Sequence, residues 1–533
     1  MVVGGVALVW LTLPLVWWTP LNVDEELTLR LTDFSFGHIF EVVSTQRGGG
    51  PLHFWLEHVL VGWWPGLGAL RIPSLVFLVA ALPAVALLVR RLLGDEASAG
   101  AVLLTAVSPI PVLYATFGRP HTMLFAWLMW STVLALKAAD DGNRRLWALA
   151  GAALGLSVFV HPTAPLYALT AFAAALVYAP RTPRQLVREA WPGAVTLFVT
   201  FVPYYLRTLH VLGDRYGVAT NATRGRTFSG RPVWEDARHF IAPGAHNLNW
   251  FTILALVGIV ALLMRGRWRV VAFCLLTIVM PVLFFSVVPA SGDSALFFDR
   301  YMIPTIPAFA ALVLAGCLAL ASFVGRYRLL VVAPIVAWLL VIELQHDIDH
   351  RRATKAINVD AAVHGVAREP KGAVLFGSTG TSGAIFSSFD YGHPANVLDH
   401  LLALRVPSVQ LVDDDSCMRV EGFLHGPSAP RYGVWVFYAA GGDEVAAATR
   451  ALGVAPVAGH YFVVRRGPAA PRALIRTGLR LRRAWKAAVP LNKRVDELLI
   501  SDRQLLAGTC VPYGELGDPD TNPHWPPVKT THQ

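Results

Sequence analysis

Residues 69–89 read ALRIPSLVFLVAALPAVALLV, and Arg90 and Arg91 follow directly. This run can cross a bilayer as one helix, because about 20 mostly apolar residues span the hydrocarbon layer. Further runs of the same character lie at about 2–20, 97–116, 121–137, 146–160, 163–180, 191–206, 249–264, 270–289, 301–323 and 329–344. The sequence therefore predicts a polytopic α-helical membrane protein with about eleven transmembrane helices.

The composition agrees with this interpretation. Of the 533 residues, 55% are hydrophobic and only 15% are charged, whereas a soluble domain carries about 25% charged residues. The net charge of +10 is compatible with nucleic-acid binding, but most basic residues lie at the ends of apolar runs, where a membrane protein needs them. A lipid bilayer is therefore expected as the partner, and nucleic acid is not.

The basic residues also predict the orientation. Every second short loop is basic, and these loops carry Arg90, Arg91, Lys137, Arg144, Arg145, Arg181, Arg184, Arg188, Arg265, Arg267, Arg269, Arg326 and Arg328. The alternate short loops carry only Arg71, Arg119 and Arg300. Because basic short loops stay in the cytoplasm, we expect a plasma (inner) membrane protein with a cytoplasmic N-terminus and an extracytoplasmic C-terminal part.

Three domains are expected. Residues 1–345 form the membrane domain, and residues 346–470 form a small extracytoplasmic α/β domain. The α/β domain is predicted from β-rich runs at 373–376 (AVLF), 409–412 (VQLV), 434–438 (VWVFY) and 461–464 (YFVV), with helices near 355–367 and 443–452. Residues 471–533 begin with a basic amphipathic stretch that suits a helix on the membrane surface and end in a Pro-rich, disordered tail.

The four cysteines are too few for a disulfide scaffold. Cys274 and Cys317 lie in apolar runs and are predicted to be packing residues. Cys417 and Cys510 lie in the outer tail, where they can form one disulfide or remain free.

The charged residues avoid the middle of every predicted span. Pumps and ion-coupled transporters place such residues along their path, so chemistry is expected at the outer surface instead. The first candidates there are Asp24 and Glu25, directly after the first span. Either Asp24 caps the following element while Glu25 is solvated, or a carboxylate acts as a general base toward a hydroxyl group, with a pKa raised by partial burial.

Several short motifs follow in order along the predicted outer face. They are VDEELTLRLTDFSFGHIF (23–40), GGGPLHFWL (48–56), ALRIPSLVF (69–77), GRPH (118–121), His161-Pro162 and Asp299-Arg300-Tyr301. Together they resemble the membrane glycosyltransferases of the C fold type, closest to the dolichyl-phosphate-mannose–protein mannosyltransferase and lipopolysaccharide sugar-transferase group. The resemblance covers about residues 1–345.

Two departures from that group bear on the site. The group often has His-Pro-Pro-Leu where this chain has Gly49-Gly50-Pro51-Leu52, so that His53 is the candidate substitute. It also commonly has a glutamate near the position of Arg119, where this chain has none. A second carboxylate role or a metal-ligand role is therefore open; a divalent cation is possible, but the sequence shows no full ligand set.

The resemblance implies a sugar donor linked to a polyprenyl phosphate. Asp24 then acts as the base and Glu25 assists or orients it, while Arg119 and Arg300 bind the donor phosphate, since a guanidinium can hold two phosphate oxygens. A single displacement inverts the sugar. The alternative for both arginines is contact with lipid headgroups.

Further candidate site residues are His53, His121, His161, Arg47 and Tyr301. The run Gly48–Gly50 is either a turn or a mobile loop over the acceptor. The acceptor itself can be a glycolipid, a polysaccharide or a protein. Two other functions remain open for the chain: a lipid or polysaccharide flippase, and a non-catalytic membrane scaffold. A single outer cavity shared by Asp24 and the two arginines would favour the enzyme.

Overall fold

The computed structural model describes the helical part of the chain and a small sheet. The described residues are 2–19, 23–32, 34–47, 49–64, 66–216, 248–287, 299–357, 374–378, 408–410, 432–438, 442–457, 461–466 and 469–488. The chain forms two compact units. The bundle unit comprises Met1–Leu13, Phe34–Leu56 and Arg71–His350, and the second unit comprises Pro14–Asp33, Glu57–Leu70 and Arg351–Gln533.

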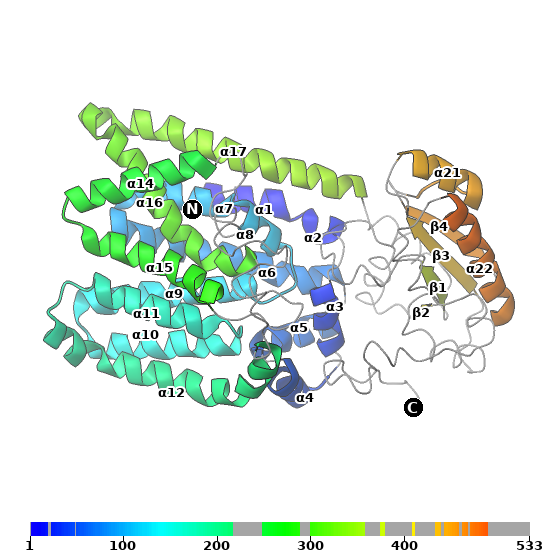
Figure 1. Cartoon of the computed structure of the whole chain (residues 1–533), viewed down its shortest axis with the longest axis horizontal. Coiled ribbons are helices and arrows are strands. Elements are labelled where there is room, and N and C mark those ends of the chain that lie inside the picture. Colours follow the sequence, from blue (N-terminus) through cyan, green and yellow to red (C-terminus); the bar gives the residue numbers. More distant parts are fainter. Residues whose placement is uncertain are drawn as a thin grey trace. The chain divides into compact units, whose positions relative to one another are not determined.

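The bundle unit is built of helices (Figure 1). Its helices, some of which extend into the second unit, are α1 (Val2–Thr12), α4 (Phe36–Val42), α5 (Pro51–Trp63), α6 (Leu67–Leu93), α7 (Asp95–Ala106), α8 (Pro109–Ala115), α9 (His121–Asp141), α10 (Arg144–Leu156), α11 (Ala164–Tyr178), α12 (Pro183–Tyr216), α14 (Leu248–Met264), α15 (Trp268–Val287), α16 (Ile306–Leu320) and α17 (Arg328–Ile357). Short π or 3₁₀ turns join them at η1 (Val43–Arg47), η2 (Ser157–Phe159), η3 (Asp299–Thr305) and η4 (Ala321–Tyr327).

Several of these helices are long and apolar enough to cross a membrane. Within the described ranges there are five, namely Leu67–Leu93, His121–Asp141, Trp268–Ser286, Arg300–Gly325 and Arg328–Asp349. A sixth is obtained if α7 and α8, which are bent by 56°, count as one broken span. The protein is thus a mostly helical, multi-pass membrane protein, and the count of about eleven spans stays a prediction.

Proline explains where two predicted spans break. Pro109 occupies the first turn of α8, where its missing N–H costs nothing, but it cannot continue α7 without losing a hydrogen bond. Pro14 likewise separates α1 from α2 (Leu15–Trp18). The runs at 2–20 and 97–116 are therefore each two helices in the structure.

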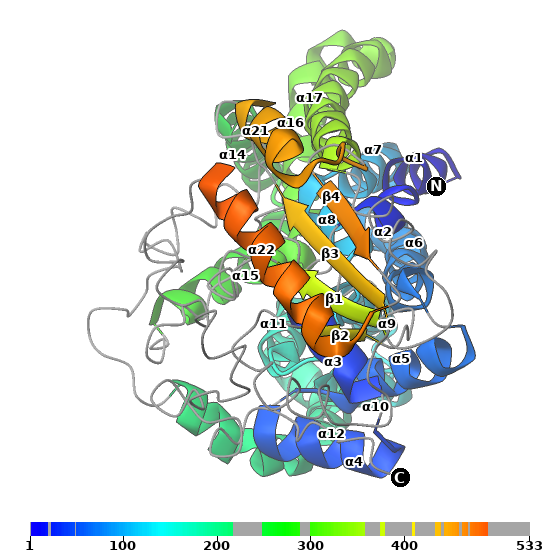
Figure 2. The ribbon, with the colours of Figure 1, turned by 90° about the vertical axis from the view of Figure 1, so that its right-hand side faces the viewer.

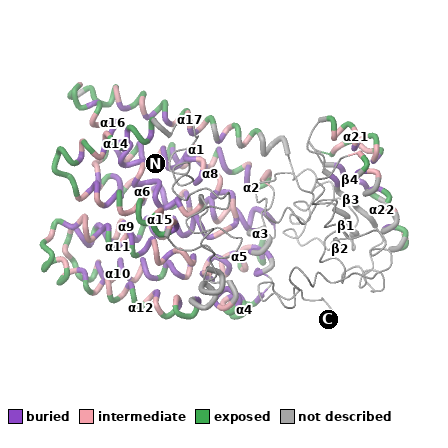
Figure 3. Tube along the Cα trace, viewed as in Figure 1, coloured by how far each residue is buried: buried purple, intermediate pink, exposed green. Residues whose placement is uncertain are grey.

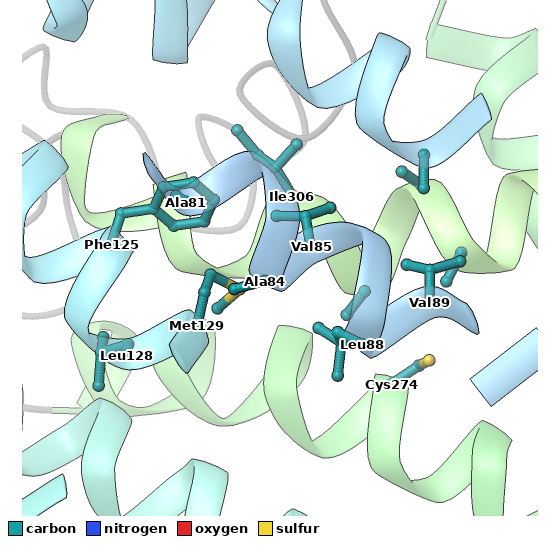
Figure 4. Close-up of a cluster of buried hydrophobic side chains, with 14 of the residues drawn as sticks. Ala81, Ala84, Val85, Leu88, Val89, Phe125, Leu128, Met129, Cys274 and Ile306 are labelled. Atoms are coloured by element: carbon teal, nitrogen blue, oxygen red, sulfur yellow. The ribbon is translucent and has the colours of Figure 1, made fainter. Parts of the chain in front are cut away.

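The core of the bundle unit lies where its long helices face one another. Figure 4 shows Val85 and Leu88 of α6 beside Met129 of α9, Cys274 of α15 and Ile306 of α16. Figure 3 shows the same pattern throughout the bundle, with buried residues on the facing sides of the helices. Cys274 is a buried free thiol, as is Cys317 of α16, as expected for packing residues.

Small residues bring two helix pairs into close contact. A Cβ atom at Gly151 of α10 would lie 1.9 Å from the carbonyl oxygen of Gly193 in α12. A Cβ atom at Gly316 of α16 would lie 1.9 Å from the carbonyl oxygen of Leu254 in α14. Helices in a membrane associate largely through such close backbone contacts, and no larger residue fits at either position.

The second unit contains α3 (Val23–Thr32), packed through Leu29 against Val61 and Leu70. It also contains a four-stranded sheet in the order β2-β1-β3-β4 (Figure 2). The strands are β1 (Val374–Ser378), β2 (Ser408–Gln410), β3 (Tyr432–Tyr438) and β4 (Tyr461–Arg466). The pairs β1–β2 and β1–β3 are parallel, while β3 and β4 are antiparallel.

Each strand overlaps one of the β-rich runs of the sequence, and α21 (Gly442–Leu452) overlaps the expected helix at 443–452. The expected helix near 355–367 lies outside the described residues beyond Ile357, as do Cys417, Cys510 and residues 489–533. The division of the tail into domains at 346–470 and 471–533 stays a prediction.

The basic amphipathic stretch forms α22 (Pro471–Ala488), whose Leu474, Leu481 and Trp485 are buried. The Trp485 ring lies 6.1 Å from the ring of Phe437 in β3, between centroids. These buried residues of α22 face the sheet. The placement of the basic segment on the membrane surface stays a prediction.

Candidate functional site

The site begins at the turn before α5. A Cβ atom at Gly50 would lie 2.4 Å from the carbonyl carbon of Phe159, and Tyr204 donates a hydrogen bond to the carbonyl oxygen of Gly49. Pro51 then opens α5, where its fixed φ suits the first turn of a helix. Of the two interpretations of the glycine run, this close packing favours a turn over a mobile loop; Gly48 lies outside the described residues.

His53 follows on the buried face of α5. It is 1% exposed, and its Nε2–H donates a hydrogen bond to the carbonyl oxygen of Gly118, with an N–O distance of 3.3 Å. Burial, and then the positive charge of Arg119, lower the pKa of His53 to about 3, against the opposing effect of the Gly118 hydrogen bond. The ring is therefore neutral at physiological pH and braces the backbone beside Arg119.

Arg119 extends from a tight turn between α8 and α9. Ser74 of α6 donates a hydrogen bond to the carbonyl oxygen of Phe117 at 2.6 Å, and the Arg119 N–H donates to the same oxygen at 2.7 Å. The guanidinium carbon lies 5.8 Å from the centre of the Phe54 ring. Contacts from α5 and α6 thus fix the backbone and the side chain of Arg119.

Three predicted site residues meet directly behind this turn. The ring centroids of His121 and His161 are 5.1 Å apart, and those of His161 and Tyr301 are 5.8 Å apart. His121 and Tyr301 are separated by 6.3 Å. We call these three residues the His–Tyr cluster; they come from the start of α9, the turn before α11 and the turn η3.

The neighbours of the His–Tyr cluster hold its rings in place. Nδ1 of His161 accepts a hydrogen bond from the backbone N–H of Thr163 at 3.2 Å, so a neutral His161 carries its proton on Nε2. Tyr167 donates a hydrogen bond to the carbonyl oxygen of Tyr301, and the Phe285 ring stacks on the Tyr301 ring at 5.1 Å. These contacts orient the three rings of the cluster.

Both predicted phosphate-binding arginines lie at this place. The guanidinium carbon of Arg300 is 5.8 Å from the centre of the Tyr301 ring. His121 interacts electrostatically with Arg300 and Arg119 as well as with His161 and His53. Two guanidinium groups around one buried ring make a positive site, and the guanidinium fork suits phosphate and carboxylate oxygens.

Asp24 and Arg47 are not placed by the structure. Their backbones lie in α3 and η1, but their side chains are outside the described residues. Glu25 is described and is fully buried in the second unit together with Glu57 of α5. Burial, and then the charge of Glu25, raise the pKa of Glu57 well above its usual value.

Glu57 was missed at the sequence level, although a signal was available. It follows His53 by four residues on α5, and residues four apart lie on the same face of a helix. The four-residue spacing from the candidate His53 was therefore the signal in the sequence that could have singled out Glu57.

A second pair of buried carboxylates lies on α17. The helix turns Val336 and Leu339 toward the core, and Glu343 and Asp347 continue that stripe, each 3% exposed. Oε2 of Glu343 and Oδ2 of Asp347 make no hydrogen bond to any residue that the structure describes. The sequence indicated a span ending near residue 344, whereas α17 continues to Ile357 and carries these groups inside the fold.

Metal ligands do not gather in the described part of the chain. Within these ranges, no group of three or more His, Cys, Asp or Glu residues is arranged to hold a metal ion. The Asp24 side chain lies outside the described residues, so the divalent cation stays a prediction from the sequence.

The chain was compared with solved structures and with known protein families. Two similar solved structures are ArnT from Cupriavidus metallidurans bound to undecaprenyl phosphate and the Archaeoglobus fulgidus oligosaccharyltransferase in complex with Zn and sulfate. ArnT is 16% identical with a TM-score of 0.48, covering 86% of this chain and 96% of ArnT. The oligosaccharyltransferase is 13% identical with a TM-score of 0.42, covering 81% of this chain and 67% of its own.

A search of curated protein sequences found no match. Residues 51–206, from the start of α5 to within α12, match the family model described as dolichyl-phosphate-mannose-protein mannosyltransferase. The matched segment contains His53, Arg119, His121 and His161. Over that segment the chain resembles the dolichyl-phosphate-mannose-protein mannosyltransferases, as the motifs of the sequence predicted.

Proposed function

We propose that the protein is a membrane glycosyltransferase of the C fold type, acting at the extracytoplasmic face of the plasma membrane. It transfers a sugar from a polyprenyl-phosphate donor to the hydroxyl group of an acceptor, with inversion at the anomeric carbon. The match of residues 51–206 to a mannosyltransferase family supports the reaction class.

The observation that carries this proposal is the convergence of positive charge at His121. Arg119 and Arg300 lie far apart in the sequence, yet both interact with the same buried ring. A guanidinium group can hold two phosphate oxygens at once. Two arginines beside one buried ring therefore suit the phosphate of a lipid-linked donor at the membrane surface.

The proposed mechanism is a single displacement. Asp24 takes the proton from the acceptor hydroxyl as its oxygen attacks the anomeric carbon. The bond from that carbon to the phosphate oxygen breaks, and its electron pair remains on the leaving polyprenyl phosphate. Arg119 and Arg300 stabilise the additional negative charge, and Glu25 orients or assists Asp24.

The test uses the purified full chain with radiolabelled polyprenyl-phosphate sugars that carry mannose, aminoarabinose or arabinofuranose. Glycolipid, polysaccharide and peptide acceptors are offered in turn. Transfer of label from one donor supports the proposal, and the absence of transfer from every donor–acceptor pair counts against it.

Variants then test the individual roles. Asp24→Asn should reduce transfer by about 10²–10⁴-fold, the usual contribution of a general base, whereas Glu41→Gln, at an exposed carboxylate, should leave it unchanged. Arg119→Ala and Arg300→Ala should raise the KM for the donor, with the exposed Arg184→Ala as their control. Full activity of Asp24→Asn would remove Asp24 from the mechanism.

A further inference from the structure

The amino end of α9 carries two buried polar side chains that the proposed mechanism does not use. His121 and Thr122 are the first two residues of this 21-residue helix, and they are 6% and 0% exposed. Nε2 of His121 and Oγ1 of Thr122 make no hydrogen bond to the residues that the structure describes. Buried polar atoms are hydrogen-bonded in the great majority of cases, so a ligand that accepts hydrogen bonds here would satisfy two adjacent groups.

The charge around this helix end defines the kind of ligand. The first N–H groups of a helix have no partner within the helix, and the helix dipole makes this end positive. Arg119 lies two residues before His121, and Arg300 interacts with the His121 ring from η3. Helix N-termini of this kind bind phosphate and other anions.

We propose that the phosphate of the lipid donor binds at the amino end of α9, with Nε2 of His121 as a direct hydrogen-bond donor to a phosphate oxygen. The inference rests on the proposed function, because it adds a residue to the donor site of that reaction. In the tautomer with its proton on Nε2, the ring donates to the phosphate. Tyr114 and Phe117 hold the ring, with centroids 5.4 and 6.4 Å from that of His121.

The test measures binding rather than turnover. The full chain is placed in phosphatidylcholine nanodiscs and titrated with undecaprenyl phosphate, and binding is followed by native mass spectrometry. His121→Phe keeps a ring of similar shape but has no donor, so the dissociation constant should rise by about 10- to 100-fold, the usual effect of a lost hydrogen bond to a charged group. His121→Gln keeps an N–H donor and should lose less.

The controls separate this effect from a general loss of structure. His38→Phe, at an exposed histidine of α4, should bind like the wild type, and thermal unfolding should show that every variant is folded. His121→Met, which is flexible and lacks a donor, replaces His121→Phe if phenylalanine prevents folding. Undecaprenol, which has no phosphate, should not distinguish the variants.

Three results would overturn the inference. One is equal binding of undecaprenyl phosphate by the wild type and the donor-free variants. Another is a similar loss with undecaprenol. The third is displacement of undecaprenyl phosphate by phosphatidylglycerol at equal concentration, with the displacement lost in the His121 variants. That result would assign the site to bilayer headgroups instead of the donor. Binding that depends on His121 without transfer from any donor would refute the proposed transferase and leave this inference intact.

Discussion

Replacing Gly50 by alanine tests whether the turn before α5 is a fixed part of the site. The new Cβ atom would lie 2.4 Å from the carbonyl carbon and oxygen of Phe159 and 2.5 Å from the carbonyl carbon of Val160. All three atoms belong to the backbone, which cannot rotate away as the end of a side chain can. The turn and η2 must therefore separate.

The required shift can be judged from these distances. Ordinary van der Waals contact begins near 3.4 Å, so the two segments must move apart by about 1 Å, and overpacking of this kind costs about 1–3 kcal/mol of stability. His53 lies three residues beyond Gly50, and it braces the turn that holds Arg119. A 1 Å misplacement near reacting groups can reduce the rate by about 100-fold.

Two measurements on the purified protein check this prediction. Gly50→Ala should lower the apparent Tm and reduce kcat/KM for the lipid donor. Gly37→Ala is the matched control: Gly37 is a helical residue of α4 with no heavy atom within 4 Å of the added Cβ, so its Tm should stay the same or rise slightly. A Gly50→Ala protein with wild-type Tm and activity would show that the turn is loose and would refute the reasoning.

Two predictions concern buried titratable groups outside the membrane spans. The pKa of His53 is lowered to about 3, so below pH 6.5 the unfolded chain binds more protons than the folded one. The stability should therefore fall as the pH drops from 6.5 toward 3, by at most about 1.4 kcal/mol per pH unit. His53→Gln should reduce this slope. The pKa of Glu57 is raised, so the wild type loses stability as the pH rises above 4.5. Glu57→Gln should therefore raise the apparent Tm at pH 8. The control Glu41→Gln, at an exposed carboxylate, should not.

Thermal unfolding in detergent as a function of pH checks both predictions. An unchanged acid slope in His53→Gln would mean that another group causes the acid sensitivity. A Glu57→Gln protein that is less stable than the wild type at pH 8 would mean that the ionised carboxylate is stabilised by its surroundings, contrary to the burial argument.

The amino-acid sequence by itself indicated the helical, membrane-spanning character of the chain and the positions of several elements. Long apolar runs flanked by arginine predicted the helices of the bundle, because lipid leaves a spanning segment no other way to satisfy its backbone. The run VWVFY predicted β3. These signals are local, and they do not depend on what each element contacts.

Tertiary structure alone decided which side chains meet. His53 bonds to Gly118, which is 65 residues away, and the His–Tyr cluster joins the start of α9, the turn before α11 and η3. Such contacts depend on how the helices pack, as do the close backbone contacts at Gly151 and Gly316. The burial of Glu57 and the covering of the sheet by α22 are also decided by packing. The periodicity of the sequence shows on which face of a helix a residue lies, but only packing determines whether that face meets lipid, water or protein.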